Sequence, residues 1–544
     1  MKEVSGVTGQ KNGVLEHVQS EKVFKWWDYL LFAAITVIIF LVTGFFLKHW
    51  FSFRSWETYP VNFILITLGL FSLILNYMGL GRWFFLPFMR RPKTMPVQEG
   101  LKVAVVTTFV PGEEPIELLE KSLSALKDLE YPHETWVLDE KDDQKVKKLC
   151  EELGVNYFSR MKMPRYQQDE GYFKSHTKYG NYNAWLHEIG FKNYDVLAAF
   201  DPDHIPAKTF LNYILGYFRD KKVGYVQAAP AYYNQKASFI AQGAAEETYS
   251  YFSSSQMIRY GMNYPVIIGS HNVHRMKALA EAGGFAPHHA DDLLLTLHYR
   301  KLGWKGVYVP KILARGLTPE AWSGYLHQQL RWARSVMDLK FRNSKSLSHF
   351  LPLKERIINM LHGLNYLYES IIISFGIVYL IYLLFTGEIL PMLHFKQWPY
   401  FLMLIGGLQL SEIFRKRFYL DWRREAGLHW RVGILKAAKW PYFLLAIWEV
   451  ILNKTPEYSI TRKSRGNGNN LQWFSVHYLI AMFLILTVFF TLLTGQFRSL
   501  EVYVISFIVI TGFLVLPFTG NAAENKRKAV LKKKVQPRLS EENV

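Results

Sequence analysis

The chain has 544 residues, of which 50% are hydrophobic, 16% aromatic and 20% charged. This composition excludes a disordered polypeptide and a collagen-like fibre, and the single cysteine, Cys150, excludes an internal disulfide scaffold. The 64 basic and 45 acidic residues give a net charge of +19, which fits binding to nucleic acid, anionic lipid, or the positive-inside pattern of a membrane protein. Because the mean hydropathy is only +0.01, we expect long apolar segments together with a sizeable water-soluble domain.

Apolar segments occur on both sides of a long polar stretch. The uncharged run 29–47 is long enough to cross the roughly 30 Å hydrocarbon layer. Acidic residues before it, and the lack of a small-residue cleavage site, argue against a signal peptide. About six spans are expected in total. They are 29–47, 59–81, 370–386, 397–411, 471–496 and 502–520. Segment 437–452 mixes tryptophan and tyrosine with charged residues, which favours an interfacial helix (434–453) over a seventh span.

The distribution of lysine and arginine predicts the orientation of these spans. Few basic residues lie between the first two spans, and many lie beside the polar stretch and after the fourth and sixth spans. We therefore expect the N-terminal segment 1–24, the polar domain 82–363 and the basic tail 521–544 in the cytoplasm of a multi-pass protein of the cell membrane. Much of the positive charge is then explained by topology, and no nucleic-acid-binding module is visible.

The polar domain alternates short β-branched runs with helical patterns. The predicted strands are 102–108, 135–138, 196–200, 223–227, 266–268 and 306–309, and helices are predicted at 116–129 and 144–152. This alternation predicts a mostly parallel sheet with helices on both faces. Ligands of such sheets bind beyond the carboxyl ends of the strands, so polar residues just after strands are candidate site residues.

Two acidic clusters follow predicted strands. Asp139 and Glu140 could accept hydrogen bonds from a nucleobase or ribose, or be solvated acids of a turn. Asp201 and Asp203 could hold Mg²⁺ or Mn²⁺, which prefer oxygen ligands, although Asp-x-Asp is also common in ordinary turns.

Two further clusters are associated with helices. Asp291 and Asp292 precede a helical pattern, where they could stabilise the helix dipole or supply a general base. The segment Gln328-Gln329-Leu330-Arg331-Trp332 could neutralise a diphosphate and stack a sugar ring, or simply anchor a helix at the membrane.

Together these clusters resemble a known motif series. The order of Asp139, Asp201-x-Asp203, Asp292 and Gln328-x-x-Arg331-Trp332 resembles the D, DxD, (T)ED, QxxRW order of the processive family 2 glycosyltransferases, the cellulose synthase-like membrane enzymes. Segments 176–181 and 281–285 resemble the HAKAGN and EAGGF segments of that family, and 458–463 resembles its FxVTxK gating loop. The resemblance covers roughly residues 100–520. It implies an α/β GT-A-type domain inserted between transmembrane helices, with a channel region over 364–520 and a gating loop over 455–470.

The resemblance also implies roles for individual residues in an inverting transfer from a nucleotide-diphosphate sugar, with UDP-glucose as the first choice. The donor would be bound by Thr107, Asp139, Lys178, Asp201, Gln328 and Arg331, and Mg²⁺ or Mn²⁺ by Asp201 and Asp203. Asp292 would be the general base, with Asp291 as its neighbour in the catalytic pair. The growing chain would meet Trp332, Tyr233, Gly269 and Ser270, and the gating loop would act through Tyr458, Ile460, Thr461 and Lys463.

Departures from the family pattern leave alternatives open. Ala290-Asp291-Asp292 replaces the expected TED, and Glu140-Lys141 replaces the second Asp and Gly of the first motif. The leading hypothesis is a synthase that makes and exports a β-glucan, either cellulose or a mixed-linkage glucan. The second is a synthase of another polysaccharide, such as hyaluronan, poly-N-acetylglucosamine or a capsular polymer. The third is a non-enzymatic transporter or receptor. The expected partners are the nucleotide sugar, the growing polysaccharide and the lipid bilayer, and no nucleic acid.

Overall fold

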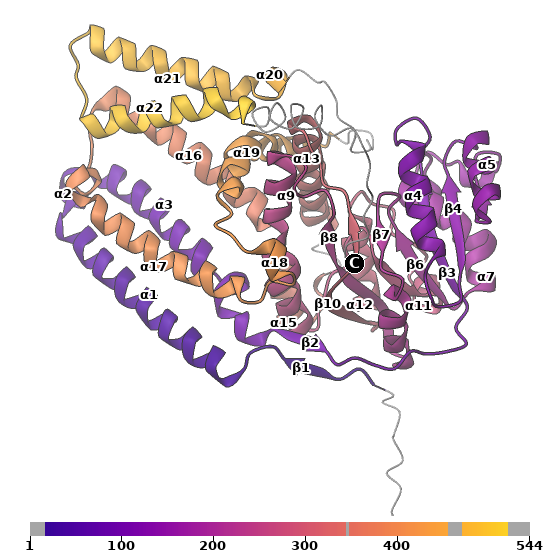
Figure 1. The fold of residues 1–544 in the computed structure, drawn as a ribbon. Coiled ribbons are helices and arrows are strands. Elements are labelled where there is room, and N and C mark those ends of the chain that lie inside the picture. The colour runs from indigo at the N-terminus through magenta and orange to yellow at the C-terminus, as the bar shows by residue number, and fades with distance from the viewer. Residues whose placement is uncertain (1–16, 344–347, 455–469, 520–544) are drawn as a thin grey trace, which may run out of the picture.

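The computed structural model describes residues 17–343, 348–454 and 470–519 (Figure 1). A domain built around one large sheet lies beside two groups of long helices, one containing α1, α3 and α17 and the other containing α16, α21 and α22. The bounds of the long helices are α1 (Trp26–Ser52), α3 (Pro60–Met78), α16 (Leu364–Thr386), α17 (Trp398–Lys416), α19 (Trp430–Ile451), α21 (Ser475–Leu493) and α22 (Leu500–Val515).

Five stretches within the described residues are long and apolar enough to cross a membrane. They are Trp26–Ser52, Pro60–Phe88, Leu364–Thr386, Ser475–Leu493 and Leu500–Phe518. Each coincides with a predicted span. The predicted span 397–411 lies within α17, which is not among the five, so the sixth span stays a prediction. Helix α17 packs along α1, with ring centroids 5.1 Å apart for Phe46 and Phe401 and 6.3 Å apart for Phe32 and Phe414.

The main sheet has eight strands in the order β5-β4-β3-β6-β9-β8-β10-β7. Their bounds are β3 (Val103–Phe109), β4 (Glu134–Asp139), β5 (Asn156–Phe158), β6 (Val196–Phe200), β7 (Ile205–Pro206), β8 (Val223–Tyr232), β9 (Asn272–Arg275) and β10 (Lys305–Gly316). Strands β5, β4, β3 and β6 run parallel, as do β8 and β10, whereas β9 is antiparallel to both β6 and β8 and β7 is antiparallel to β10. The sheet is therefore mixed, with its parallel half at the N-terminal side.

One predicted strand is wrong. Residues 266–268 form no strand, and the antiparallel strand β9 begins only at Asn272. Their backbone groups are instead bonded by side chains, because the Ile267 N–H donates to Thr296 Oγ1 at 3.0 Å and the Ile268 N–H donates to Gln227 Oε1 at 2.8 Å. Residues 266–268 are apolar and buried like a strand, but their backbone N–H groups bond to side chains and not to a neighbouring strand.

Helices cover both faces of the sheet, as expected. Val103 and Val105 of β3 pack with α4 (Ile116–Lys127) and α8 (Phe210–Ile214), while Ala104 and Val106 pack on the other face with α6 (Lys178–Trp185). The alternation of side chains along a strand produces these two cores. The domain also contains the helices α5 (Gln144–Leu153), α9 (Phe239–Ser250), α10 (Gln256–Gly261), α12 (Asp291–Lys301), α13 (Trp322–Asp338) and α15 (Leu353–Leu361).

The contacts that join the sheet domain to the long helices include a strand pair and ion pairs. The short strand β1 (Ser20–Lys22), just before α1, pairs antiparallel with β2 (Arg90–Pro92), just before the domain. Helix α19 is attached to α9 by two ion pairs, Lys439 to Glu247 at 2.6 Å and Arg431 to Glu246 at 2.9 Å. Helix α19 contains the segment predicted to be interfacial, and its depth in the bilayer stays a prediction.

Candidate active site

The centre of the site is a lysine that joins the end of β6 to the loop before β9. Lys178, the first residue of α6, donates from Nζ to Asp201 Oδ1 at 2.5 Å and to the Gly269 carbonyl at 2.8 Å. Asp201 directly follows β6, and its N–H donates to Ser270 Oγ at 3.0 Å. Burial is the largest single influence and lowers the pKa of Lys178, but the combined effects of Asp201, Tyr182 and Asp291 exceed it, so that the pKa is raised. The lysine is therefore a fixed positive charge at the carboxyl end of the sheet.

A pair of carboxylates lies on the other side of Gly269. Asp291 and Asp292 form the first turn of α12, and Asp292 Oδ2 is 4.0 Å from the position that a Cβ on Gly269 would occupy. Burial, and then the adjacent charge of Asp291, raise the pKa of Asp292 to about 7. A carboxylate with a pKa near neutrality is suited to accept a proton from a hydroxyl group.

Three side chains next to Lys178 could hold a divalent cation. Ligand atoms of Asp201, Asp203 and His204 lie within 4.8 Å of one another, and Asp203 is fully buried. The Asp203 carboxylate accepts from the Leu317 N–H at 2.8 Å through Oδ2, while Oδ1 is 3.2 Å from His204 Nδ1. Two carboxylates suit Mg²⁺ or Mn²⁺, and an imidazole nitrogen suits Mn²⁺ better than Mg²⁺. The donor set therefore fits a divalent ion, and the ammonium group on Asp201 shows that a cation is favoured at this position.

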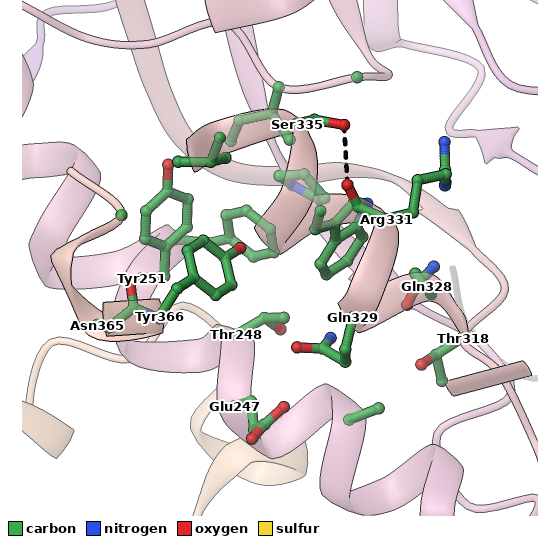
Figure 2. A pocket seen from close by; sticks show the side chains of 18 of the residues that line it. Glu247, Thr248, Tyr251, Thr318, Gln328, Gln329, Arg331, Ser335, Asn365 and Tyr366 are labelled. Carbon is green, nitrogen blue, oxygen red and sulfur yellow. Dashed lines mark hydrogen bonds between the residues drawn. The ribbon is translucent and has the colours of Figure 1, made fainter. Parts of the chain in front are cut away.

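Helix α13 forms a second wall of the site. Gln328, Gln329 and Arg331 of α13 line the cavity, and in Figure 2 Gln329 points toward Thr248 and Glu247 of α9. Gln329 is buried and lies 3.4 Å from Lys439 Nζ. Trp332, on the same helix, is 37% exposed, so its ring can contact a ligand.

A single cavity connects these groups. Its volume is about 2170 Å³. Nine of the predicted site residues line it: Lys178, Asp201, Gly269, Ser270, Asp291, Asp292, Gln328, Arg331 and Trp332. The cavity also reaches Ser72 of α3, Glu369 of α16 and Gln409 of α17, so it extends from the sheet edge to the long helices.

Several predicted residues lie elsewhere. Thr107 is fully buried and its hydroxyl has no hydrogen-bond partner among the described residues, while the next residue, Thr108, lines the cavity. Asp203 and Tyr233 also lie outside the lining, although their neighbours His204 and Tyr232 belong to it. The gating-loop residues Tyr458, Ile460, Thr461 and Lys463 lie outside the described residues.

Asp139 lies at the end of β4 in a different environment from the one predicted. It is fully buried, and its carboxylate accepts hydrogen bonds from the Lys141 N–H at 2.9 Å, the Asp143 N–H at 2.6 Å and the Tyr157 hydroxyl at 2.8 Å. In this arrangement Asp139 fixes the turn that follows β4, and its contact with a donor stays a prediction.

Two long-range pairs shape the site and were not predicted. Arg160 is fully buried and donates to Glu140 Oε1 at 2.7 Å and to the Lys174 carbonyl at 3.0 Å, which holds the segment leading to Lys178. His288 receives the Ala290 N–H on Nδ1 at 2.9 Å, so its Nε2 carries the proton and donates to Asp338 Oδ2, also at 2.9 Å. This second pair fixes the residues just before Asp291. No local sequence signal marks either partner.

The sequence of the sheet domain is similar to known proteins. Residues 103–335 match the family model described as Glycosyltransferase like family 2. The "Cellulose synthase catalytic subunit [UDP-forming]" of Xanthomonas axonopodis pv. citri is 27% identical over 320 residues, which cover 56% of this chain and 40% of that protein. The protein of the same name from Pseudomonas fluorescens is 25% identical over 348 residues, covering 62% and 45%. The matched segments thus span less than half the length of these relatives.

The structure is also similar to solved structures. A mannosyltransferase of Pyrobaculum calidifontis in complex with GDP-Man and Mn²⁺ shares 15% identity with a TM-score of 0.48, covering 73% of this chain and 99% of that one. The sheet, the order of the motifs and the family match together define the class: the chain carries a family 2 glycosyltransferase domain with a GT-A-like fold. The transporter or receptor hypothesis is therefore not favoured.

Proposed function

We propose that the protein is a processive inverting glycosyltransferase that polymerises UDP-glucose into a β-glucan and passes the product across the membrane. The observation that carries this proposal is the position of Asp292. It lies across Gly269 from the Lys178–Asp201 pair, in a cavity that continues to helices α3, α16 and α17. The proposed donor site, the proposed base and the extension toward the long helices thus belong to one cavity. The names of the relatives, cellulose synthase catalytic subunits, support glucan as the product.

In the proposed reaction Asp292 takes the proton of the acceptor hydroxyl as its oxygen attacks the anomeric carbon. The new glycosidic bond forms while the bond from that carbon to the diphosphate oxygen breaks, and the nucleoside diphosphate leaves. Attack on the face opposite the leaving group inverts the configuration, so an α-linked donor gives a β-linkage. Asp291 lies beside the base and raises its proton affinity.

The donor would be held at the sheet edge. Lys178 and Arg331 would provide positive charge for the diphosphate, with Gln328 beside them in the cavity lining. Thr107 and Asp139, which are buried next to the cavity-lining residues Thr108 and Glu140, are further proposed contacts. A divalent ion bound by Asp201 and Asp203, with His204 beside them, would offset the negative charge of the leaving group.

The acceptor would lie along α13 and the loop at Gly269. The exposed indole of Trp332 offers a flat surface for the terminal sugar, next to Gly269 and Ser270, and Tyr233 is a further proposed contact. The gating loop with Tyr458, Ile460, Thr461 and Lys463 would close over the bound nucleotide and exclude water. The sheet domain would face the cytoplasm, where nucleotide sugars are made.

The proposal is tested with membrane vesicles containing the full chain, supplied with Mg²⁺ or Mn²⁺ and a panel of labelled nucleotide sugars. We expect incorporation of label from UDP-glucose into a polymer that a β-1,4-glucanase or a mixed-linkage glucanase degrades. Incorporation from UDP-N-acetylglucosamine alone would instead support a different polysaccharide. No incorporation from any donor would contradict the polymerase proposal.

A further inference from the structure

One wall of the cavity carries an arginine that forms no ion pair among the described residues. Arg259 of α10 lines the cavity and is only 9% exposed. Its Nε and Nη1 atoms are buried and have no hydrogen-bond partner among the described residues, and no ion pair of this side chain occurs within them. Its guanidinium carbon lies 5.9 Å from the centroid of the Tyr251 ring. A buried cation without a partner is unfavourable unless a ligand supplies the missing negative charge.

Two nitrogen-bearing groups lie close to Arg259: the ammonium of Lys340 and the imidazole of His362, which is neutral because burial and then the charge of Arg259 lower its pKa well below the ordinary value. Lys340 donates from Nζ to the carbonyls of Asn359 and Met360, at 2.8 and 3.1 Å, and so does not meet a carboxylate there. The His362 ring lies 6.3 Å from the Tyr251 ring, and its Nδ1 is buried without a partner in the described part of the chain. Burial, and then the charge of Arg259, lower the pKa of Lys340 to about 8. This response is typical of cations gathered without compensating acids.

The position of this cluster relates it to the membrane surface. Helix α10 lies against the end of the second candidate span, since a Cβ on Gly261 would meet the Phe88 carbonyl oxygen at 1.8 Å. His362 directly precedes Gly363 and α16, where the third candidate span begins. The ends of membrane spans lie at the depth of the lipid headgroups. Both Arg259 and Asp292 act electrostatically on the Tyr251 hydroxyl, so Tyr251 lies near both groups.

We propose that Arg259, with His362 and Lys340 beside it, forms a second anion site of the cavity that binds the phosphate group of a membrane lipid. The guanidinium would donate to two phosphate oxygens, the geometry for which arginine is best suited. The lipid chains would leave the cavity between the ends of α3 and α16, where Gly79, Gly81 and Leu364 line it. This site is distinct from the donor site at Lys178 and does not depend on which sugar the enzyme transfers.

The test uses the full chain in detergent micelles and follows the midpoint of thermal unfolding. The probes are dioctanoyl phosphatidate, dioctanoylglycerol, which has the same chains without phosphate, and inorganic phosphate. We expect a saturable rise of the midpoint with phosphatidate and none with the other two at equal concentration. The substitution Arg259→Gln should weaken phosphatidate binding by about tenfold or more, whereas Arg259→Lys, which keeps the charge, should weaken it less.

A matched control removes a charge at the same level of the molecule. Lys354 of α15 is exposed, so Lys354→Gln should leave phosphatidate affinity within about twofold of the unmodified protein. UDP binding should be unchanged in Arg259→Gln. Without lipid, Arg259→Gln should be at least as stable as the parent, because it removes an unpaired buried charge.

An equal rise with inorganic phosphate would overturn the lipid as the occupant. Unchanged phosphatidate affinity in Arg259→Gln, equal loss in Lys354→Gln, or lower stability of the lipid-free Arg259→Gln protein would overturn the site itself. Failure of sugar incorporation in vesicles would leave these binding results unaffected, so the two proposals fail separately.

Discussion

At the scale of single residues, the proposed chemistry depends on one carboxylate. Asp292 has the burial, the neighbour and the position next to Gly269 that a base requires. Asp292→Asn keeps the size of the side chain but cannot take a proton. We expect the elongation rate to fall by about 10²–10⁴-fold while UDP binding is kept, because Lys178 and Asp201 remain. Initial rates and calorimetric titration with UDP measure the two effects, and normal elongation would mean that another group is the base.

The same carboxylate predicts a pH dependence. Because burial and Asp291 raise the pKa of Asp292 to about 7, the base form is present above pH 7 and is lost as the pH falls through this value. We expect kcat/KM to fall about tenfold for each pH unit below 7. In Asp291→Asn the like charge is absent, so the acidic limb should move to lower pH. A profile that stays flat down to pH 5 would contradict the assignment.

The sequence predicted which residues meet but not how they are held. The family resemblance implied that Lys178, Asp201 and Asp292 belong to one site, and the position of Asp201 after a strand placed it at the carboxyl edge of the sheet. The pairs Glu140–Arg160 and His288–Asp338 are different. Their partners are 20 and 50 residues apart, and a charged side chain in a sequence looks the same whether it is solvated or buried. Only the folded chain shows that Arg160 has no exposed surface.

At the scale of elements, the segment between β5 and α6 depends on that arginine. Arg160 donates to Glu140 and to the carbonyls of Tyr166, Phe173 and Lys174, so it organises the loop that places Lys178. Removing one partner of a buried ion pair costs about 3–5 kcal/mol. We expect Arg160→Met to lose stability in this range, measured by thermal or denaturant unfolding of the full chain in detergent.

A double variant separates the contribution of the Glu140–Arg160 ion pair to stability from the contribution of side-chain packing. Glu140→Leu combined with Arg160→Met removes both charges, and it should recover part of the lost stability because no unpaired carboxylate remains. If Arg160→Met were as stable as the parent, the carbonyl contacts of the arginine would not hold the loop.

The predicted strands are correct where the backbone N–H and C=O groups bond to a neighbouring strand. The prediction is wrong where side chains accept the backbone hydrogen bonds instead. The runs at β3, β4 and β6 are β-branched, buried and paired in register. Residues 266–268 have the same composition, but Gln227 and Thr296 take their backbone N–H groups. Hydrophobic periodicity reports burial, and it does not report which partner satisfies the backbone.

At the scale of the whole molecule, helix α17 illustrates what composition misses. It is not among the five segments long and apolar enough to cross a membrane, yet its rings pack along α1 from Phe46 to Phe32. The basic residues at that end, Arg415 and Lys416, line the cavity. A span whose polar end faces a cavity is expected to be less apolar than one surrounded by lipid.

The proposed exit path of the polymer predicts an effect at the membrane end of the cavity. Ser72 of α3 lines this end, and one turn further along α3 a Cβ on Gly69 would lie 3.4 Å from the Phe375 ring of α16. Ser72→Trp would fill the space that a sugar chain needs. We expect the average polymer length to fall by about tenfold or more, while UDP binding stays unchanged because the donor site is remote.

Gel filtration measures the polymer length made by Ser72→Trp, and calorimetry measures its affinity for UDP. The control is Leu68→Trp on the same helix, where the side chain is 61% exposed and faces away from the packed interior. The added ring would there lie toward lipid, so chain length should not change. Full-length polymer from Ser72→Trp would show that the product leaves by another path, whereas shortening in both variants would point to a general disturbance of α3. Selective shortening in Ser72→Trp would connect the catalytic cavity to transport.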